Sequence, residues 1–134
     1  MSSYRHARVL LLGAAALALA ACANIDVKTT EYVGAPHAAP TQASNVEILR
    51  TEPTKPHVRL GEIVVSASTE PAPSATEIEQ KLRVEAAKIG GDAVVVVYDR
   101  IQPVAAYVNG PLWNRDIEAV EGRKLQGVVI RYTR

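Results

Sequence analysis

The sequence predicts an α+β fold in which one helix packs on a mostly antiparallel four-stranded sheet, in the order β-β-α-β-β. Three observations support this prediction. Residues 75–89 have the spacing and the end signals of an amphipathic helix, apolar stretches typical of strands flank it on both sides, and 134 residues are too few for two ordinary domains. We therefore expect one globular α+β domain over residues 45–134.

Two strands are expected before the helix. The first begins at Val46 and ends before Pro53, and the second covers residues 58–66. The alternation of the second strand slips at Gly61-Glu62, where a count by twos from the apolar positions reaches a charged residue. An additional residue there, a β-bulge, would return the apolar side chains to one face. The alternative is a strand that begins later, near Glu62.

The helix has the clearest signals in the sequence. Ser74 and Glu77 have the spacing of a capping box, in which each side chain accepts a hydrogen bond from an unpaired amide at the helix start. Gly90-Gly91 supplies the left-handed conformation at which helices commonly end. The apolar stripe that faces the core consists of Ile78, Leu82, Ala86 and Ile89.

A third strand is expected over residues 93–99, where a run of valines makes both faces apolar. One helix covers only one face of a small sheet. We therefore expect the second face to be covered by the segment that follows or by another copy of the chain. Residues 101–124 show no sustained period and predict irregular structure, and the last strand covers residues 126–133.

The N-terminus predicts export. Residues 1–21 read as a lipoprotein signal peptide, with basic residues before an uncharged stretch that is too short to span a bilayer. Leu19-Ala20-Ala21-Cys22 matches the lipobox of bacterial lipoproteins and predicts acylation of Cys22. Ala21-Cys22-Ala23 also fits ordinary signal cleavage, which would release a soluble product. We favour the lipobox because it accounts for the position of the single cysteine.

Acylation would make Cys22 a membrane anchor, since the three acyl chains of a mature lipoprotein hold it stably whereas one holds only marginally. Ala23 follows the cysteine in place of Asp, which by the usual lipoprotein sorting rule predicts the outer membrane, with the domain in the periplasm. Residues 22–44 contain Gly34, two prolines and no sustained period, so they predict a flexible tether behind the lipidated cysteine. The alternation over residues 24–28 predicts a short strand as the alternative.

Residues 60–98 resemble a family of small α/β domains. Leu60-Gly61-Glu62-Ile63, followed by the run from Ile78 to Val95 that ends Gly-Gly-Asp-Ala-Val-Val, is similar to the pattern of two groups. These are the RcsF-like lipoproteins, outer-membrane stress sensors of the Rcs phosphorelay, and the YbjQ-like proteins. The resemblance implies an envelope role or a ring-forming oligomer. The paired cysteines of the stress sensors are missing here, and no metal-ligand set transfers from the YbjQ-like proteins.

The other patterns predict no chemistry. The sequence has no phosphate-binding glycine motif, nucleophile elbow or metal-ligand spacing, so we expect no enzyme, cofactor or metal site. We interpret His57 as a surface histidine rather than a ligand, Glu62 as a solvent-facing carboxylate, and Asp99-Arg100 as a solvated or paired strand end. The formal net charge of +1 gives no electrostatic basis for binding nucleic acid.

Tyr107, Leu112 and Trp113 are the candidate partner contacts. They surround the Asn109-Gly110-Pro111 turn, and aromatic residues often anchor interfaces. Alternatively, Trp113 folds back as a lid over the third strand, which we favour because the valine run needs a cover. We predict a membrane-anchored, non-catalytic envelope lipoprotein that binds a partner or senses the envelope. The alternatives are a structural protein that self-assembles through its valine-rich face and a hydrolase with unrecognised residues.

Overall fold

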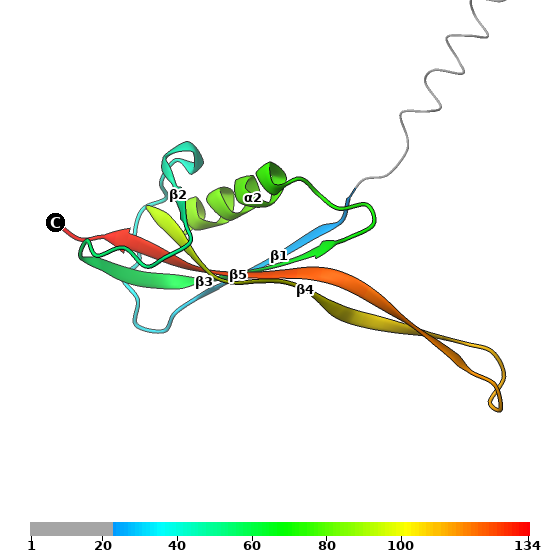
Figure 1. The fold of residues 1–134 in the computed structure, drawn as a ribbon. Coiled ribbons are helices and arrows are strands. Elements are labelled where there is room, and N and C mark those ends of the chain that lie inside the picture. Colours follow the sequence, from blue (N-terminus) through cyan, green and yellow to red (C-terminus); the bar gives the residue numbers. More distant parts are fainter. Residues whose placement is uncertain (1–22) are drawn as a thin grey trace, which may run out of the picture.

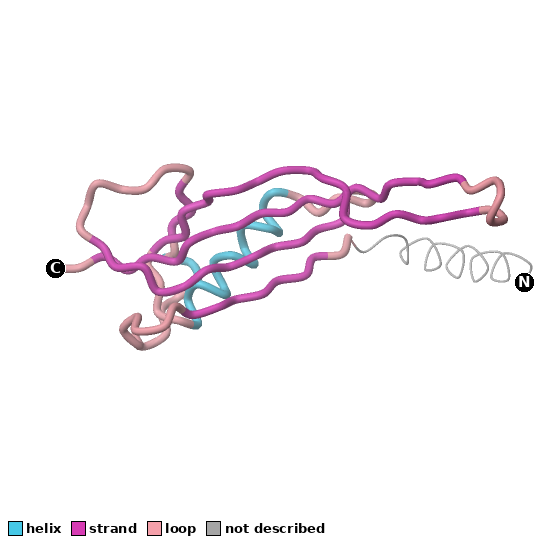
Figure 2. The backbone as a smooth tube through the Cα atoms, turned by 90° about the horizontal axis from the view of Figure 1, so that it is seen from below, coloured by secondary structure: helices cyan, strands magenta, loops and turns pink. Residues whose placement is uncertain are grey.

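The computed structural model describes residues 23–134, so the predicted signal peptide and Cys22 lie outside the described residues. The fold is α+β, with a helix lying across one face of a five-stranded mixed sheet (Figures 1 and 2). The elements are β1 (Ile25–Glu31), the 3₁₀ helix η2 (Ala43–Asn45), β2 (Glu47–Leu49), β3 (His57–Ser68), α2 (Ala75–Lys88), β4 (Ala93–Asn109) and β5 (Asp116–Tyr132). Within this part of the chain, no helix is long and apolar enough to cross a membrane.

The sheet has the order β1-β3-β5-β4-β2, and only β2 and β4 pair in parallel. The predicted count of four strands is wrong, because residues 25–31 form a strand instead of part of a tether. β1 pairs with β3 along its whole length, and Ile25 and Val27 pack against the core. The alternation of apolar and polar residues, which favours a half-buried strand, was the correct signal here.

β3 contains the predicted bulge, one residue earlier than expected. Its register against β5 shifts between Arg59 and Gly61, which leaves Leu60 as the additional residue. Leu60, Ile63 and Val65 are all buried in the cluster of side chains beneath α2. The bulge therefore keeps the apolar side chains of both halves of the strand on one face.

α2 confirms the helix prediction to within one residue. The amide of Glu77 donates to Oγ of Ser74 at 3.2 Å, and the amide of Ser74 donates to the Glu77 carboxylate at 2.7 Å. The helix ends before Gly90, whose φ of +82° is left-handed. The side chains that it buries against the sheet are Ile78, Leu82, Ala86 and Ala87.

The irregular structure predicted over residues 101–124 is wrong, because these residues form the outer part of a long hairpin. β4 and β5 have 17 residues each and pair from Ala93 and Ile130 out to Asn109 and Asp116. The register shifts twice on β4, at Val97 and at Val104, and Pro103 lies beside the second shift. A period of two that is broken twice does not look like a strand in the sequence.

The two apolar faces of β4 are covered by other parts of the same chain. Val94 and Val96 are buried beneath α2, and Val95 packs with Ile130 on the opposite face. The segment 50–55, between β2 and β3, lies over this second face: it lines a small hollow above Val95, and Nζ of its Lys55 is 4.3 Å from the ring centroid of Tyr132. The cover therefore precedes β4 in the sequence and does not follow it.

Candidate functional site

The outer part of the β4–β5 hairpin projects beyond the rest of the sheet (Figures 1 and 2). β3 pairs with β5 as far as Ser68 and Gly122, and Gly122 lies opposite Gln102 of β4. Beyond this point, residues 103–121 form a two-stranded ribbon, which we call the arm. Among residues 23–134, no third strand pairs with either edge of the arm.

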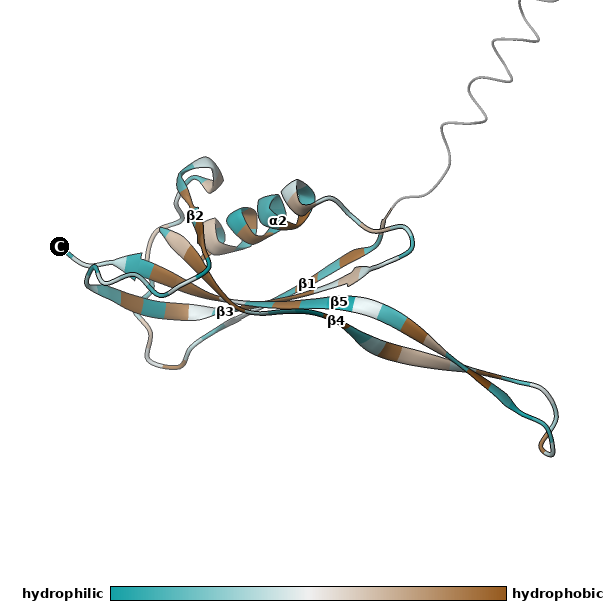
Figure 3. Cartoon of the chain, in the orientation of Figure 1, coloured by the Kyte–Doolittle hydropathy of each residue, from teal (hydrophilic) through white to brown (hydrophobic). Residues whose placement is uncertain are grey.

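The arm exposes its apolar side chains. All its residues are exposed except Val120, which is half-buried. The exposed fractions of the large apolar side chains run from 54% at Val108 to 87% at Trp113, and Figure 3 shows hydrophobic segments continuing along both strands of the arm. Exposed apolar groups that lie together mark binding surfaces, and a ribbon of two strands alone is only marginally stable. The arm is therefore the best candidate for a binding element.

The register gives the arm two different faces. Directly paired residues of an antiparallel ladder share a face, so Val108 and Ile117 lie together, on the side of the sheet that α2 covers farther along. Two alanines follow them on that face. Tyr107 pairs with Glu118 on the opposite face. One side of the arm is therefore an apolar stripe, and the other combines an aromatic ring with a carboxylate.

The tip of the arm is a β-turn. Gly110 adopts a φ of +99°, which glycine tolerates, and the amide of Asn114 donates to the carbonyl oxygen of Pro111 at 3.0 Å. Leu112 and Trp113 are the two central residues of this turn and are therefore the outermost residues of the hairpin. They are also the two most exposed large apolar side chains of the arm.

The structure places the three candidate contact residues at two different parts of the arm. Leu112 and Trp113 are neighbours at the tip, whereas Tyr107 lies on the side of the ribbon. The favoured interpretation of Trp113 as a lid is wrong, because strand pairing carries it away from the third strand. Val108 and Ile117 were not predicted as contacts. An Asn-Gly turn after apolar residues is a strong hairpin signal, and it could have predicted them.

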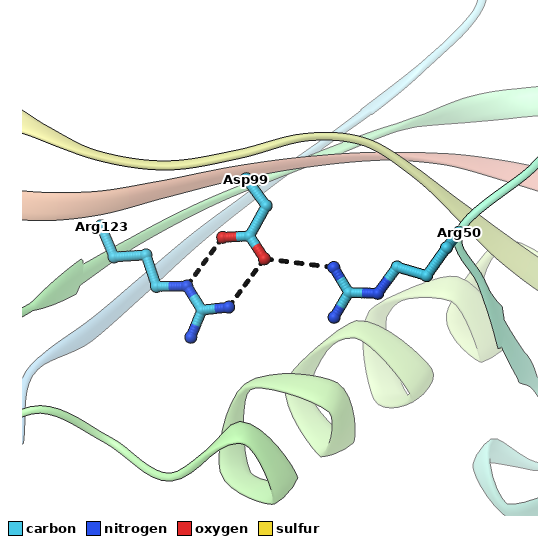
Figure 4. A network of polar contacts seen from close by, with 3 residues as sticks. All are labelled: Arg50, Asp99 and Arg123. Carbon is cyan, nitrogen blue, oxygen red and sulfur yellow. Dashed lines mark hydrogen bonds and ion pairs between the residues drawn. The ribbon is translucent and has the colours of Figure 1, made fainter.

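A cluster of three charged residues, Arg50, Asp99 and Arg123, lies at the base of the arm, as Figure 4 shows. The Asp99 carboxylate accepts hydrogen bonds from Nε and an Nη of Arg123, both at 2.7 Å, and from Arg50 at 3.1 Å. The bonds from Arg123, with a smaller contribution from Arg50, hold the pKa of Asp99 below its ordinary value despite partial burial. Asp99 is thus paired, as one of the two interpretations had it, but it lies within a strand. The cluster ties β4, β5 and the segment after β2 together.

A groove of about 820 Å³ lies between the arm and the neighbouring ends of β1 and β3. Val104, Tyr107 and Glu118 line it from the arm, and Asn24 and Asp26 line it from β1 and the residue before it. The groove therefore offers apolar and acidic groups to a ligand. One of its lining residues, Asn24, is two positions after Cys22 in the sequence.

The other two residues considered for chemistry lie away from the arm. His57, at the start of β3, donates from Nδ1 to the carbonyl oxygen of Lys55 at 2.7 Å, and its Nε2 is 3.1 Å from Glu52. These two hydrogen bonds raise the pKa of His57. Glu62 is half-buried in β3. Within residues 23–134, no three His, Cys, Asp or Glu side chains come together as a metal site.

Comparison with known proteins shows no family. No protein-family model and no curated protein matches the chain. Among solved structures, the chain is similar to a Francisella virulence factor, FvfA, with 11% sequence identity and a TM-score of 0.46 over 79% of this chain and 97% of that chain. A likeness at this level carries no inference about function. The resemblance to RcsF-like and YbjQ-like proteins therefore stays a prediction from the sequence.

Proposed function

We propose that this chain is a non-catalytic lipoprotein of the bacterial envelope, anchored to the outer membrane through acylated Cys22, that binds a partner in the periplasm through its arm. The lipobox and the single cysteine support the anchor. The observation that carries the binding role is the arm itself, a two-stranded ribbon with exposed apolar residues and two edges that no other strand of residues 23–134 pairs with. Tyr107, Leu112 and Trp113 are the proposed contact residues.

The physical basis of binding is the burial of the arm. A partner that covers the stripe of Val108 and Ile117 gains about 1.5–3 kcal/mol for each fully buried side chain. A partner segment that pairs with an open edge also satisfies backbone groups that otherwise bond to water. Both contributions stabilise a ribbon that has little support of its own.

A second copy of this chain is the alternative partner. Self-assembly through the valine-rich face would have little exposed surface to bury. Val94, Val95 and Val96 are at most 8% exposed, and of these four valines only Val97 is exposed. The open edges of the arm favour a different route, in which two arms pair edge to edge. The proposed function and this alternative use the same surface and differ in its occupant.

Photo-crosslinking in cells tests the binding role. A crosslinking amino acid at Val108 of the full chain should give adducts with an envelope protein, whereas the same group at Val33 should not. Val33 is a matched control because it is fully exposed and lies after β1, away from the arm. Adducts of the chain with itself would establish the alternative. No adduct from Val108, or equal adducts from both positions, would show that the arm is not the binding element.

Labelling tests the anchor separately. Cells that grow with an alkyne-tagged palmitate should label the wild-type chain, and the substitution Cys22→Ser should abolish the label. An unlabelled wild-type chain would refute the lipoprotein assignment.

A further inference from the structure

Asn24, which directly precedes β1, lies beside the base of the arm. The amide of Ser68 donates to the carbonyl oxygen of Asn24 at 2.9 Å, and the amide of Asn24 donates to Oγ of Ser68 at 3.0 Å. Ser68 also pairs with Gly122, the residue that follows the arm in β5. Asn24, Ser68 and Gly122 therefore lie side by side across the sheet, and Gly122 directly follows the last residue of the arm.

This arrangement leaves little length between the fold and an anchor at Cys22. Cys22 is two residues before Asn24, and an extended chain of two residues reaches about 7 Å. The sequence predicts a flexible coil after the cysteine, but β1 already begins at Ile25. A lipid on Cys22 would therefore hold this end of the sheet at the membrane surface and would not let the domain move far from it.

The arm extends from the same end of the sheet. β1 starts opposite Ala67 and runs toward Gly61, away from the arm, and the C-terminus leaves the sheet at the far end (Figures 1 and 2). In Figure 1 the start of β1 and the arm lie toward the same end of the sheet, and the loop between β3 and α2 lies near the start of β1. The arm continues beyond Gly122 to Asn109 and Asp116, roughly 20–25 Å at 3.2–3.4 Å per residue. The tip therefore reaches a membrane that holds Cys22 when the arm lies along the membrane surface.

The tip has the composition of a membrane contact. Leu112 and Trp113 are 79% and 87% exposed. Tryptophan is enriched at the boundary between water and lipid, where its apolar ring is buried and its N–H stays near polar groups. Arg115 is exposed two residues later, and its guanidinium suits a lipid phosphate. Asp116, which is also exposed, follows Arg115, so the two apolar side chains of the tip precede one basic and one acidic residue.

We propose that Leu112 and Trp113 insert into the membrane leaflet that holds the acyl chains of Cys22. The proposal rests on the proposed function, because it requires the acylated anchor. The anchor makes the contact intramolecular, so two side chains suffice where they would not hold a free protein. The insertion assigns Leu112 and Trp113 to the membrane in place of the protein partner. The sides of the arm, with Val108 and Tyr107, remain the contacts for that partner.

The sequence supplies its own probe, since Trp113 is the only tryptophan. The mature acylated protein, whose chain begins at Cys22, is reconstituted into vesicles of phosphatidylethanolamine with a minor share of phosphatidylglycerol, with either ordinary or brominated acyl chains. Bromine quenches a tryptophan that is inserted among the chains. We expect the brominated vesicles to remove most of the Trp113 emission. Equal emission in both kinds of vesicle, from protein that is acylated, would overturn the proposal.

Two variants make the result specific to the tip. In the double variant Trp113→Tyr with Val33→Trp, the single tryptophan lies after β1, toward the end of the sheet away from the arm, and should keep its emission in brominated vesicles. Quenching there would indicate lipid contact over the whole domain and would overturn insertion of the tip. The substitution Leu112→Asn keeps the probe in place and should reduce the quenching of Trp113.

The failure of this proposal can be distinguished from that of the proposed function. A chain without the palmitate label lacks the anchor, and both proposals fall. A labelled chain whose Trp113 is not quenched overturns only the insertion. Protein adducts from a crosslinker placed at Trp113, together with unquenched emission, would assign the tip to the protein partner.

Discussion

The two halves of the β4–β5 hairpin have similar residues in opposite environments. Val94 and Val129 pair in the inner half and are completely buried, whereas Val108 and Ile117 pair in the outer half and are more than half exposed. The difference comes from the elements that cover them, since α2 and β3 reach only the inner half. The inner half therefore carries the stability of the fold, and the outer half keeps apolar surface free for binding.

The largest expected effect is on stability, and it comes from the same substitution, Ile→Ala, made in the inner and in the outer half of β5. Ile130→Ala removes a side chain that is 0% exposed and should lower the free energy of unfolding by about 2–5 kcal/mol. Ile117→Ala removes one that is 73% exposed and should change it by less than about 0.5 kcal/mol. Urea unfolding followed by circular dichroism measures both. Similar losses would show that the arm packs against something in the free protein.

A smaller effect is expected at the boundary between the halves. Asp99→Asn removes the charge that pairs with Arg123 and Arg50 and should cost about 1–2 kcal/mol, because the cluster is partly open to water. The amides of residues 103–121 should also exchange their hydrogens faster, while those beneath α2 change little. Asp116→Asn, near the tip, is the matched control. Uniformly faster exchange would mean that the cluster does not act on the arm in particular.

The same cluster predicts a dependence on pH. The pKa of Asp99 is lower in the folded chain than in the unfolded one, mainly through its bonds from Arg123. Its contribution is therefore present above the unfolded pKa and is lost as the pH falls through the folded pKa. Unfolding curves in acid should differ between wild type and Asp99→Asn, and they should converge at the lowest pH.

His57 lies outside this cluster and has the opposite dependence on pH. Its pKa is raised in the folded chain, so its contribution to stability is present below its unfolded pKa and is lost as the pH rises through the folded pKa.

The smallest effect on stability should accompany a large effect on binding. Val108→Asn with Ile117→Asn places polar groups on the exposed stripe and should change the free energy of unfolding by less than about 1 kcal/mol. The same double variant should lose the protein adducts that form from a crosslinker at Tyr107. Retained adducts would place the partner on the opposite face of the arm.

Local signals predicted the local features. The capping box of Ser74 and Glu77 and the slip near Gly61 are read from a few adjacent residues, and the structure confirms the helix and the bulge. The segment 50–55 covers the second face of β4 by a contact between distant parts of the chain, and no local pattern encodes it.

The candidate site was predicted in part. The turn and its aromatic residues pointed to Tyr107 and Trp113 as contacts, although Trp113 was also interpreted as a lid. The stripe of Val108 and Ile117 depends on the register between two strands, and the bulges at Val97 and Val104 hide that register in the sequence.

The pairing of β1 has a mechanical consequence. The seven residues of β1 join the sheet to any load that reaches the chain through Asn24, and each of them pairs with β3. A pull along the strand stretches these hydrogen bonds together, as a shear, whereas a pull across the sheet opens them in turn from Ile25. The direction of a force on Asn24 relative to the axis of β1 therefore decides whether the strand holds or peels.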